Sequence, residues 1–154
     1  MVFPDFQQFS SLAKTGNLIP VYREIMADMD TPVTAFRKID DGNYSFLLES
    51  IEGGEKWARY SFLGSSPSVI IRSKGNRVET IRSGQLEVSE ADDPTRLIQQ
   101  MLKQYQPVEV SGLPRFVGGM VGYLGYDMVR HFENLPTDNP DDVGAWDSFF
   151  MLAD

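Results

Sequence analysis

Residues 68–89 read SVIIRSKGNRVETIRSGQLEVS, and this stretch decides the fold class of the chain. It contains three strand-like runs, SVIIRSK, RVETIRS and QLEVS. The dipeptides Gly75-Asn76 and Ser83-Gly84 separate the runs, and two-residue connections of this kind favour tight β-hairpins. The stretch therefore predicts a three-stranded antiparallel meander.

The segments on both sides of the meander predict further strands and helices. Strands are expected at Leu18–Ile25 as an edge strand, Tyr44–Ser50, Arg59–Leu63, Phe116–Tyr123 as a buried strand, and Trp146–Leu152. Helices are expected to begin near Pro4, at Thr31-Pro32 and at Asp93-Pro94, with a short helical patch at Asp127–Phe132. The strands outnumber the helices and are grouped together, which favours an α+β fold with a mainly antiparallel sheet.

The composition is that of one soluble globular domain. The chain has 154 residues, of which 42% are hydrophobic and 23% charged, so wholesale disorder is excluded. No apolar run approaches the ~20 residues that cross a bilayer, and the N-terminus lacks the pattern of a secretory signal. The absence of cysteine excludes disulfides and thiolate metal sites and fits a reducing compartment, so we expect a cytoplasmic protein.

The charge balance argues against two classes of partner. There are 14 basic and 22 acidic residues, which give a net charge of −8. A nucleic-acid-binding protein needs a positive surface to displace counterions from phosphates, and anionic membranes attract the same kind of surface. We therefore expect neither nucleic acid nor a membrane as a partner.

Several polar and glycine-rich motifs favour structural roles over catalysis. The glycines at 118, 119, 122 and 125 lack the Lys-Ser/Thr of a phosphate-binding loop and predict close packing of the sheet. His131 is the only histidine, and one histidine cannot form a two-histidine metal site. The acidic pairs at 40–41, 92–93 and 141–142 lie in expected turns or at a helix start, where aspartates serve as caps. We expect no catalytic and no metal-ligating residues in this chain.

Residues 47–64, LLESIEGGEKWARYSFLG, place complementary charges on two neighbouring predicted strands. Glu49 offers a carboxylate for an ammonium group, Arg59 a guanidinium for a carboxylate, and Ser50 a hydroxyl for either. Such a set can hold a free amino acid. Glu49 and Arg59 can equally form a cross-strand ion pair on the face of a sheet, so the residues alone leave both interpretations open.

Four blocks in order resemble the N-terminal part of anthranilate synthase component I, a chorismate-utilising enzyme. They are PVYREI (20–25), TPVTAFRKI (31–39), LLESIEGGEKWARYSFLG (47–64) and VGGMVGYLGYDMVRHFENLP (117–136). The resemblance extends from about Ile19 to Leu152. It implies that residues 1–154 are a single domain, the N-terminal regulatory portion of a chain about three times longer, and part of a larger α/β sandwich.

The resemblance also implies a function for the longer chain. That enzyme converts chorismate and ammonia into anthranilate and pyruvate in tryptophan biosynthesis, with the ammonia delivered by a glutamine amidotransferase subunit. Its Mg²⁺ and chorismate sites lie in a C-terminal chorismate-binding region, which would be a further partner of this chain. Residues 1–154 alone are then expected to hold no cofactor and to be inactive.

The family's LLES motif, which matches residues 47–50, is its inhibitor-binding element. The resemblance therefore implies that Leu48, Glu49 and Ser50 form part of a feedback site for L-tryptophan. Arg59 falls where the family places a basic residue near the bound tryptophan.

Two other interpretations remain. Component I of aminodeoxychorismate synthase, in the folate pathway, shares the same layout, although residues 53–64 favour anthranilate synthase. A stand-alone amino-acid-binding or protein-interaction module is the alternative without an enzyme. Because the chain ends two residues after an apolar strand, we expect a piece of a longer protein whose strand edge at Phe149–Leu152 is left open for self-association.

Overall fold

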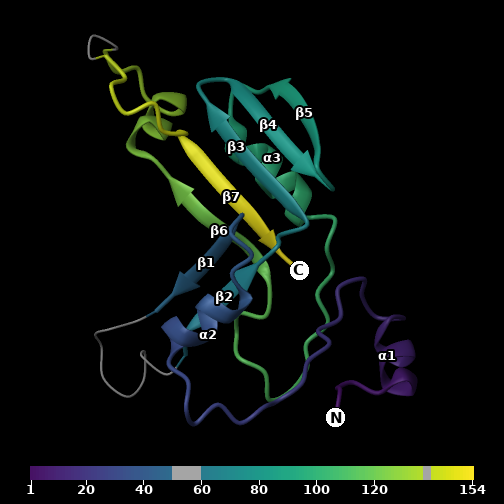
Figure 1. The fold of residues 1–154 in the computed structure, drawn as a ribbon. Helices are drawn as coiled ribbons and strands as arrows, with labels where there is room; N and C mark the ends of the chain where they lie inside the picture. The colour runs from purple at the N-terminus through teal and green to yellow at the C-terminus, as the bar shows by residue number, and fades with distance from the viewer. Residues whose placement is uncertain (50–59, 137–139) are drawn as a thin grey trace.

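A five-stranded antiparallel sheet forms the centre of the computed structural model, which describes residues 1–49, 60–136 and 140–154. The sheet order is β5-β4-β3-β7-β6 (Figure 1). Its strands are β3 (Val69–Lys74), β4 (Arg77–Arg82), β5 (Gln85–Glu90), β6 (Gly119–Leu124) and β7 (Ser148–Ala153). Together with a smaller two-stranded sheet and a few helices, this arrangement confirms the α+β class.

The predicted meander is confirmed as β3, β4 and β5. The hairpins close with the pairs Lys74↔Arg77 and Arg82↔Gln85, so each connection has the expected two residues. In the second connection both Ser83 (φ 50°) and Gly84 (φ 76°) lie in the left-handed region. Two-residue hairpins of type I′ require this conformation at both central positions.

The helices begin where the sequence predicts. In α2 (Pro32–Ile39), Thr31 is the N-cap and its hydroxyl accepts a hydrogen bond from the backbone N–H of Thr34. In α3 (Pro94–Leu102), the carboxylate of Asp93 accepts one from Thr95. These side chains satisfy N–H groups that have no partner within the helix. The other described helices are α1 (Phe6–Leu12) and the 3-10 helix η1 (Tyr126–His131). Asp5 is the N-cap of α1, so Pro4 lies just before the helix.

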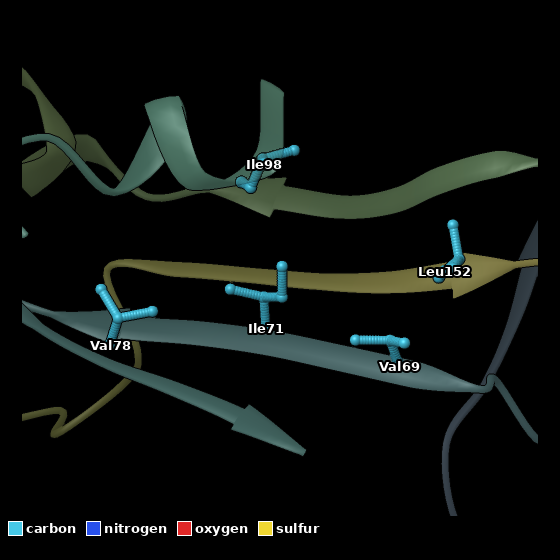
Figure 2. Packing of buried hydrophobic residues seen from close by; sticks show 5 residues of the cluster. All are labelled: Val69, Ile71, Val78, Ile98 and Leu152. Atoms are coloured by element: carbon cyan, nitrogen blue, oxygen red, sulfur yellow. The ribbon is translucent and has the colours of Figure 1, made fainter. Parts of the chain in front are cut away.

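The main core lies between α3 and one face of the large sheet. Ile98 of α3 packs with Val69 and Ile71 of β3, Val78 of β4 and Leu152 of β7 (Figure 2). Full burial of each such side chain contributes about 1.5–3 kcal/mol, so this cluster fixes the position of α3 on the sheet.

The smaller sheet is a hairpin of β1 (Ser45–Leu48) and β2 (Phe62–Ser65), on which α2 packs. Aromatic pairs join it to the large sheet. The ring of Tyr44, just before β1, lies 5.6 Å from that of Phe149 in β7. Phe62 in β2 meets Phe116, just before β6, edge to face at 5.2 Å. These ring contacts help to hold the hairpin against the large sheet.

Three of the predicted strands were wrong in extent or type. The strand expected at Tyr44–Ser50 is β1, which spans only Ser45–Leu48, so Glu49 lies just beyond the strand and not on it. Leu18–Ile25 forms only isolated bridges, Phe3↔Tyr22 and Leu18↔Pro107, because Pro20 interrupts the run and has no N–H to donate. The strand expected at Arg59–Leu63 is β2, which begins three residues later at Phe62.

The last two predicted strands differ from the expectation in which of them lies at an edge of the sheet. Phe116–Tyr123 was expected to be buried, but β6 is an edge strand in which Val121 is buried while the following three residues are exposed. The apolar C-terminal strand was expected to expose an edge. It is β7 instead, paired on one side with β3 and on the other with β6. The prediction of an open edge at Phe149–Leu152 was therefore wrong, because β6 pairs with this edge.

Glu79 in β4 is the buried acidic residue of the large sheet, 5% exposed. Both of its carboxylate oxygens are paired, with Arg72 at 2.7 Å and with Arg77 at 2.7 Å. The guanidinium of Arg72 also stacks on the ring of Trp146, 4.3 Å from its centroid. The hydrogen bond from Arg72 lowers the pKa of Glu79 below its ordinary value, against the opposing effect of desolvation.

This lowered pKa predicts a pH-dependent contribution to stability. The ionised form of Glu79 is favoured in the folded state, so its stabilising effect is complete at neutral pH and is lost as the pH falls through its folded-state pKa. In urea unfolding between pH 7 and pH 3, Glu79→Gln is expected to be less stable than the parent at pH 7, with the difference shrinking on acidification. The control is Glu87→Gln, at an exposed position of β5. Parallel pH profiles of the parent and Glu79→Gln would contradict the assignment.

Candidate functional site

The candidate site begins where β1 ends. Leu48 is the last residue of β1 and pairs with Phe62, the first residue of β2. Cross-strand partners lie on the same face of a sheet, so Leu48 and Phe62 share one face of the hairpin. Leu48 is 47% exposed, and Glu49 follows it as an exposed residue just beyond the strand. An apolar and an acidic side chain are thus both accessible at this end of the hairpin.

The other two residues of the candidate site, Ser50 and Arg59, lie outside the described residues, as does the Gly53-Gly54 pair. The structure places the two chain segments that lead to them, because Glu49 and Ser61 leave the β1–β2 hairpin at the same end. It does not decide between the amino-acid site and the Glu49–Arg59 ion pair, so both interpretations remain predictions.

An apolar groove of about 570 Å³ lies next to the start of β2. Five aromatic residues contribute to its lining, with Tyr60 and Phe62 from around the start of β2 and Tyr22, Tyr105 and Phe116 from elsewhere in the chain. Its volume is within the range of small-molecule sites. Neither Leu48 nor Glu49 is among its lining residues. The groove is therefore next to the expected site, but the two described residues of that site do not line it.

This groove was missed in the sequence because its walls come from distant segments, residues 18–22, 60–62, 102–107, 113–119 and 152–154. No local pattern in any one of these segments indicates that they come together in the fold. A second groove of about 380 Å³ shares Phe62 and Phe116 and is also lined by Phe46 and Met151. Phe62 is therefore in contact with both cavities.

The motifs that were expected to be structural have structural partners. A ring nitrogen of His131, Nδ1, lies 2.7 Å from the backbone oxygen of Asp92. A side chain at Gly118 would place its Cβ 2.8 Å from the backbone oxygen of Ala153, which confirms the expected close packing of the glycine-rich strand. Asp93 caps α3, and hydrogen bonding from Thr95 lowers its pKa.

The other acidic pairs behave in the same way. Asp40 and Asp41 accept backbone hydrogen bonds from the turn residues two positions further on, Gly42 and Asn43. Asp141 accepts one from Gly144 and pairs with Lys74 at 2.6 Å. These contacts confirm the turn and cap roles that the sequence predicts for them.

Within residues 1–49, 60–136 and 140–154, no three His, Cys, Asp or Glu side chains gather in a way that could hold a metal ion. No helix in the described part of the chain is long and apolar enough to span a membrane.

Comparison with known proteins gives a consistent result. No family model matches the chain. It is 40% identical over 156 residues to "Anthranilate synthase component 1" of Acetivibrio thermocellus, a match that covers 100% of this chain and 31% of that protein. The proteins of the same name from Aquifex aeolicus and Pseudomonas putida are 37% and 40% identical, each over 96% of this chain and 30% and 31% of their own length.

The chain thus spans less than a third of the length of these relatives. The identity extends along the whole chain and recurs in proteins that share one name. On this evidence the chain belongs to the anthranilate synthase component 1 family and matches the N-terminal domain of its members.

Proposed function

We propose that residues 1–154 are the N-terminal, regulatory portion of a longer anthranilate synthase component I. The longer polypeptide would form anthranilate and pyruvate from chorismate, and residues 1–154 would carry part of its feedback site for L-tryptophan. The observation that supports this most strongly is the match of the entire chain to relatives of which it spans 30–31%. The described residues contain no cluster that fits Mg²⁺, so the proposal assigns the metal and chorismate to the remaining polypeptide.

The accessible end of β1 supports the regulatory part of the proposal. The exposed carboxylate of Glu49 can accept hydrogen bonds from the ammonium group of an amino acid. Arg59 is proposed to hold its carboxylate, and the hydroxyl of Ser50 to hydrogen-bond to either charged group. Leu48 and the neighbouring aromatic groove offer apolar surface for an indole ring, whose burial contributes much of the affinity for such a ligand.

The proposal includes the partners that this reaction requires. Ammonia would come from a glutamine amidotransferase subunit, and the C-terminal chorismate-binding region would complete both the active site and the effector site. The reaction would take place in the cytoplasm. Aminodeoxychorismate synthesis is the competing chemistry, and the names of the three relatives described above favour anthranilate formation.

A comparison of two proteins tests the proposed function. Incubated with chorismate, Mg²⁺ and ammonium, residues 1–154 alone are expected to give no anthranilate fluorescence, whereas the complete gene product gives steady turnover. The physical reason is that the proposed chorismate and metal ligands lie outside residues 1–154. Turnover by the pure 154-residue chain, or formation of aminodeoxychorismate by the complete product, would contradict the proposal.

A further inference from the structure

The two edges of the large sheet differ in chemistry. The edge strand β5 has the sequence QLEVSE, and all six of its residues are exposed. Its carboxylates at Glu87 and Glu90 oppose pairing with another strand, as charges commonly do on free sheet edges. The opposite edge strand, β6, has the sequence GMVGYL and carries no charge.

The inner and outer sides of β6 also differ. On the inner side β6 pairs with β7 over all six residues, and a side chain at Gly122 would place its Cβ 2.7 Å from the backbone Cα of Phe150. On the outer side, away from β3 in Figure 1, the described part of the chain supplies no further strand. Leu124 at the end of β6 is 56% exposed, and the exposed ring of Tyr126 follows it. The edge is therefore uncharged, exposed toward its C-terminal end, and not paired with another strand within the described part of the chain.

We propose that the outer edge of β6 pairs with a strand from the part of the longer polypeptide outside residues 1–154, and that this pairing joins the two parts. A strand added there would satisfy the outward N–H and C=O groups of β6. The relatives are long enough to supply it, since this chain covers only 30–31% of them.

A segment of the same polypeptide is favoured over a second copy of this chain. A tethered segment has a high effective concentration at the edge. Two copies would each carry a net charge of −8 and repel one another. The inference rests on the part of the proposed function that makes this chain a section of a longer protein, and it does not depend on tryptophan binding.

Amide hydrogen exchange in the complete gene product tests the inference, with β5 as an internal control. Amides of an edge strand that point away from the sheet exchange rapidly, whereas those of a strand paired on both sides are protected. Peptides covering residues 119–124 are expected to show every amide protected, at least about 10-fold more than the outward amides of residues 85–90. Equal rapid exchange of the outward amides on both strands would overturn the inference.

Two matched variants sharpen the test. Leu124 in β6 and Leu86 in β5 are 56% and 55% exposed, so lysine substitutions at these two positions form a pair matched in side-chain exposure. In the complete product, Leu124→Lys is expected to reduce the protection of residues 119–124 at least about 10-fold, and Leu86→Lys to leave it unchanged. Equal effects of the two variants would overturn the proposal.

Two further results would also overturn it. One is protection of β6 that depends on protein concentration, which would indicate a second copy of the chain. The other is a gene that ends at codon 154. The exchange measurement reports on β6 and does not depend on inhibition by tryptophan. Rapid exchange at the β6 edge would therefore leave the tryptophan proposal unaffected. In the same way, a missing tryptophan response would leave the proposed pairing of β6 unaffected.

Discussion

Replacement of Gly122 by alanine is expected to separate β6 from β7. A Cβ at this position would contact the backbone oxygen of Phe149 and would lie 2.8 Å from its carbonyl carbon and 2.7 Å from the Cα of Phe150. These are backbone atoms of a strand paired on both sides, so they cannot move aside as a flexible side chain would. Over-packing of an interior typically costs about 1–3 kcal/mol, and we expect a loss of stability at the upper end of that range.

The control for this variant is Gly42→Ala. Gly42 has a φ of 78°, and a Cβ there would have no atom within 4 Å. Alanine at this position is expected to cost about 1–2 kcal/mol through backbone strain alone. Urea unfolding should therefore show a larger loss for Gly122→Ala, with amide exchange increased across residues 119–124. Equal losses in the two variants, or unchanged exchange in β6, would contradict the close approach of the two strands.

The second large effect concerns the effector site. In the complete gene product, Ser50→Ala is expected to raise the L-tryptophan concentration that gives half inhibition by about 10- to 100-fold. A hydrogen bond to a charged ligand group contributes about 1.5–3 kcal/mol, which corresponds to that range of affinity. Turnover without tryptophan should be unchanged, because the proposed role of Ser50 is to contact the effector and not chorismate. Arg59→Ala should act in the same direction by removing a partner of the ligand carboxylate.

The matched control is Ser89→Ala, at an exposed position of β5. This variant makes the same chemical change on another strand, and its inhibition curve should coincide with that of the parent. The measurement is the initial rate of anthranilate formation over a series of L-tryptophan concentrations. An unchanged curve for Ser50→Ala would remove this residue from the site.

The local elements of the fold were predictable because their signals are local. The turns at residues 75–76 and 83–84 set the meander, and the caps Thr31 and Asp93 set the starts of α2 and α3. Each of these signals depends on the conformation or hydrogen bonding of a few adjacent residues.

Features that depend on long-range pairing were harder to predict from the sequence. An apolar run such as FFML indicates a buried strand but not its neighbours, so the position of β7 between β3 and β6 could not be deduced. The same ambiguity made β6 look buried, since glycine and valine occur in edge and central strands alike. Residues 18–25 were predicted to be an edge strand, yet they form isolated bridges and no strand.

The candidate site was likewise predictable only in part from the sequence. The LLES motif was visible in the sequence, but the strand that carries it was predicted to run to Ser50, whereas β1 ends at Leu48. The aromatic groove beside Phe62 was not visible, because Tyr22, Tyr105 and Phe116 come together only in the folded chain. The roles of Glu49, Ser50 and Arg59 toward a ligand stay predictions.

The most direct test of the central claim is a titration of the complete gene product with L-tryptophan, followed both by calorimetry and by the rate of anthranilate formation from chorismate. We expect saturable binding over the same concentrations that inhibit the reaction, and weaker binding with unchanged uninhibited turnover in Glu49→Gln. Anthranilate formation that L-tryptophan leaves unchanged, or equal binding by the parent and Glu49→Gln, would contradict this expectation.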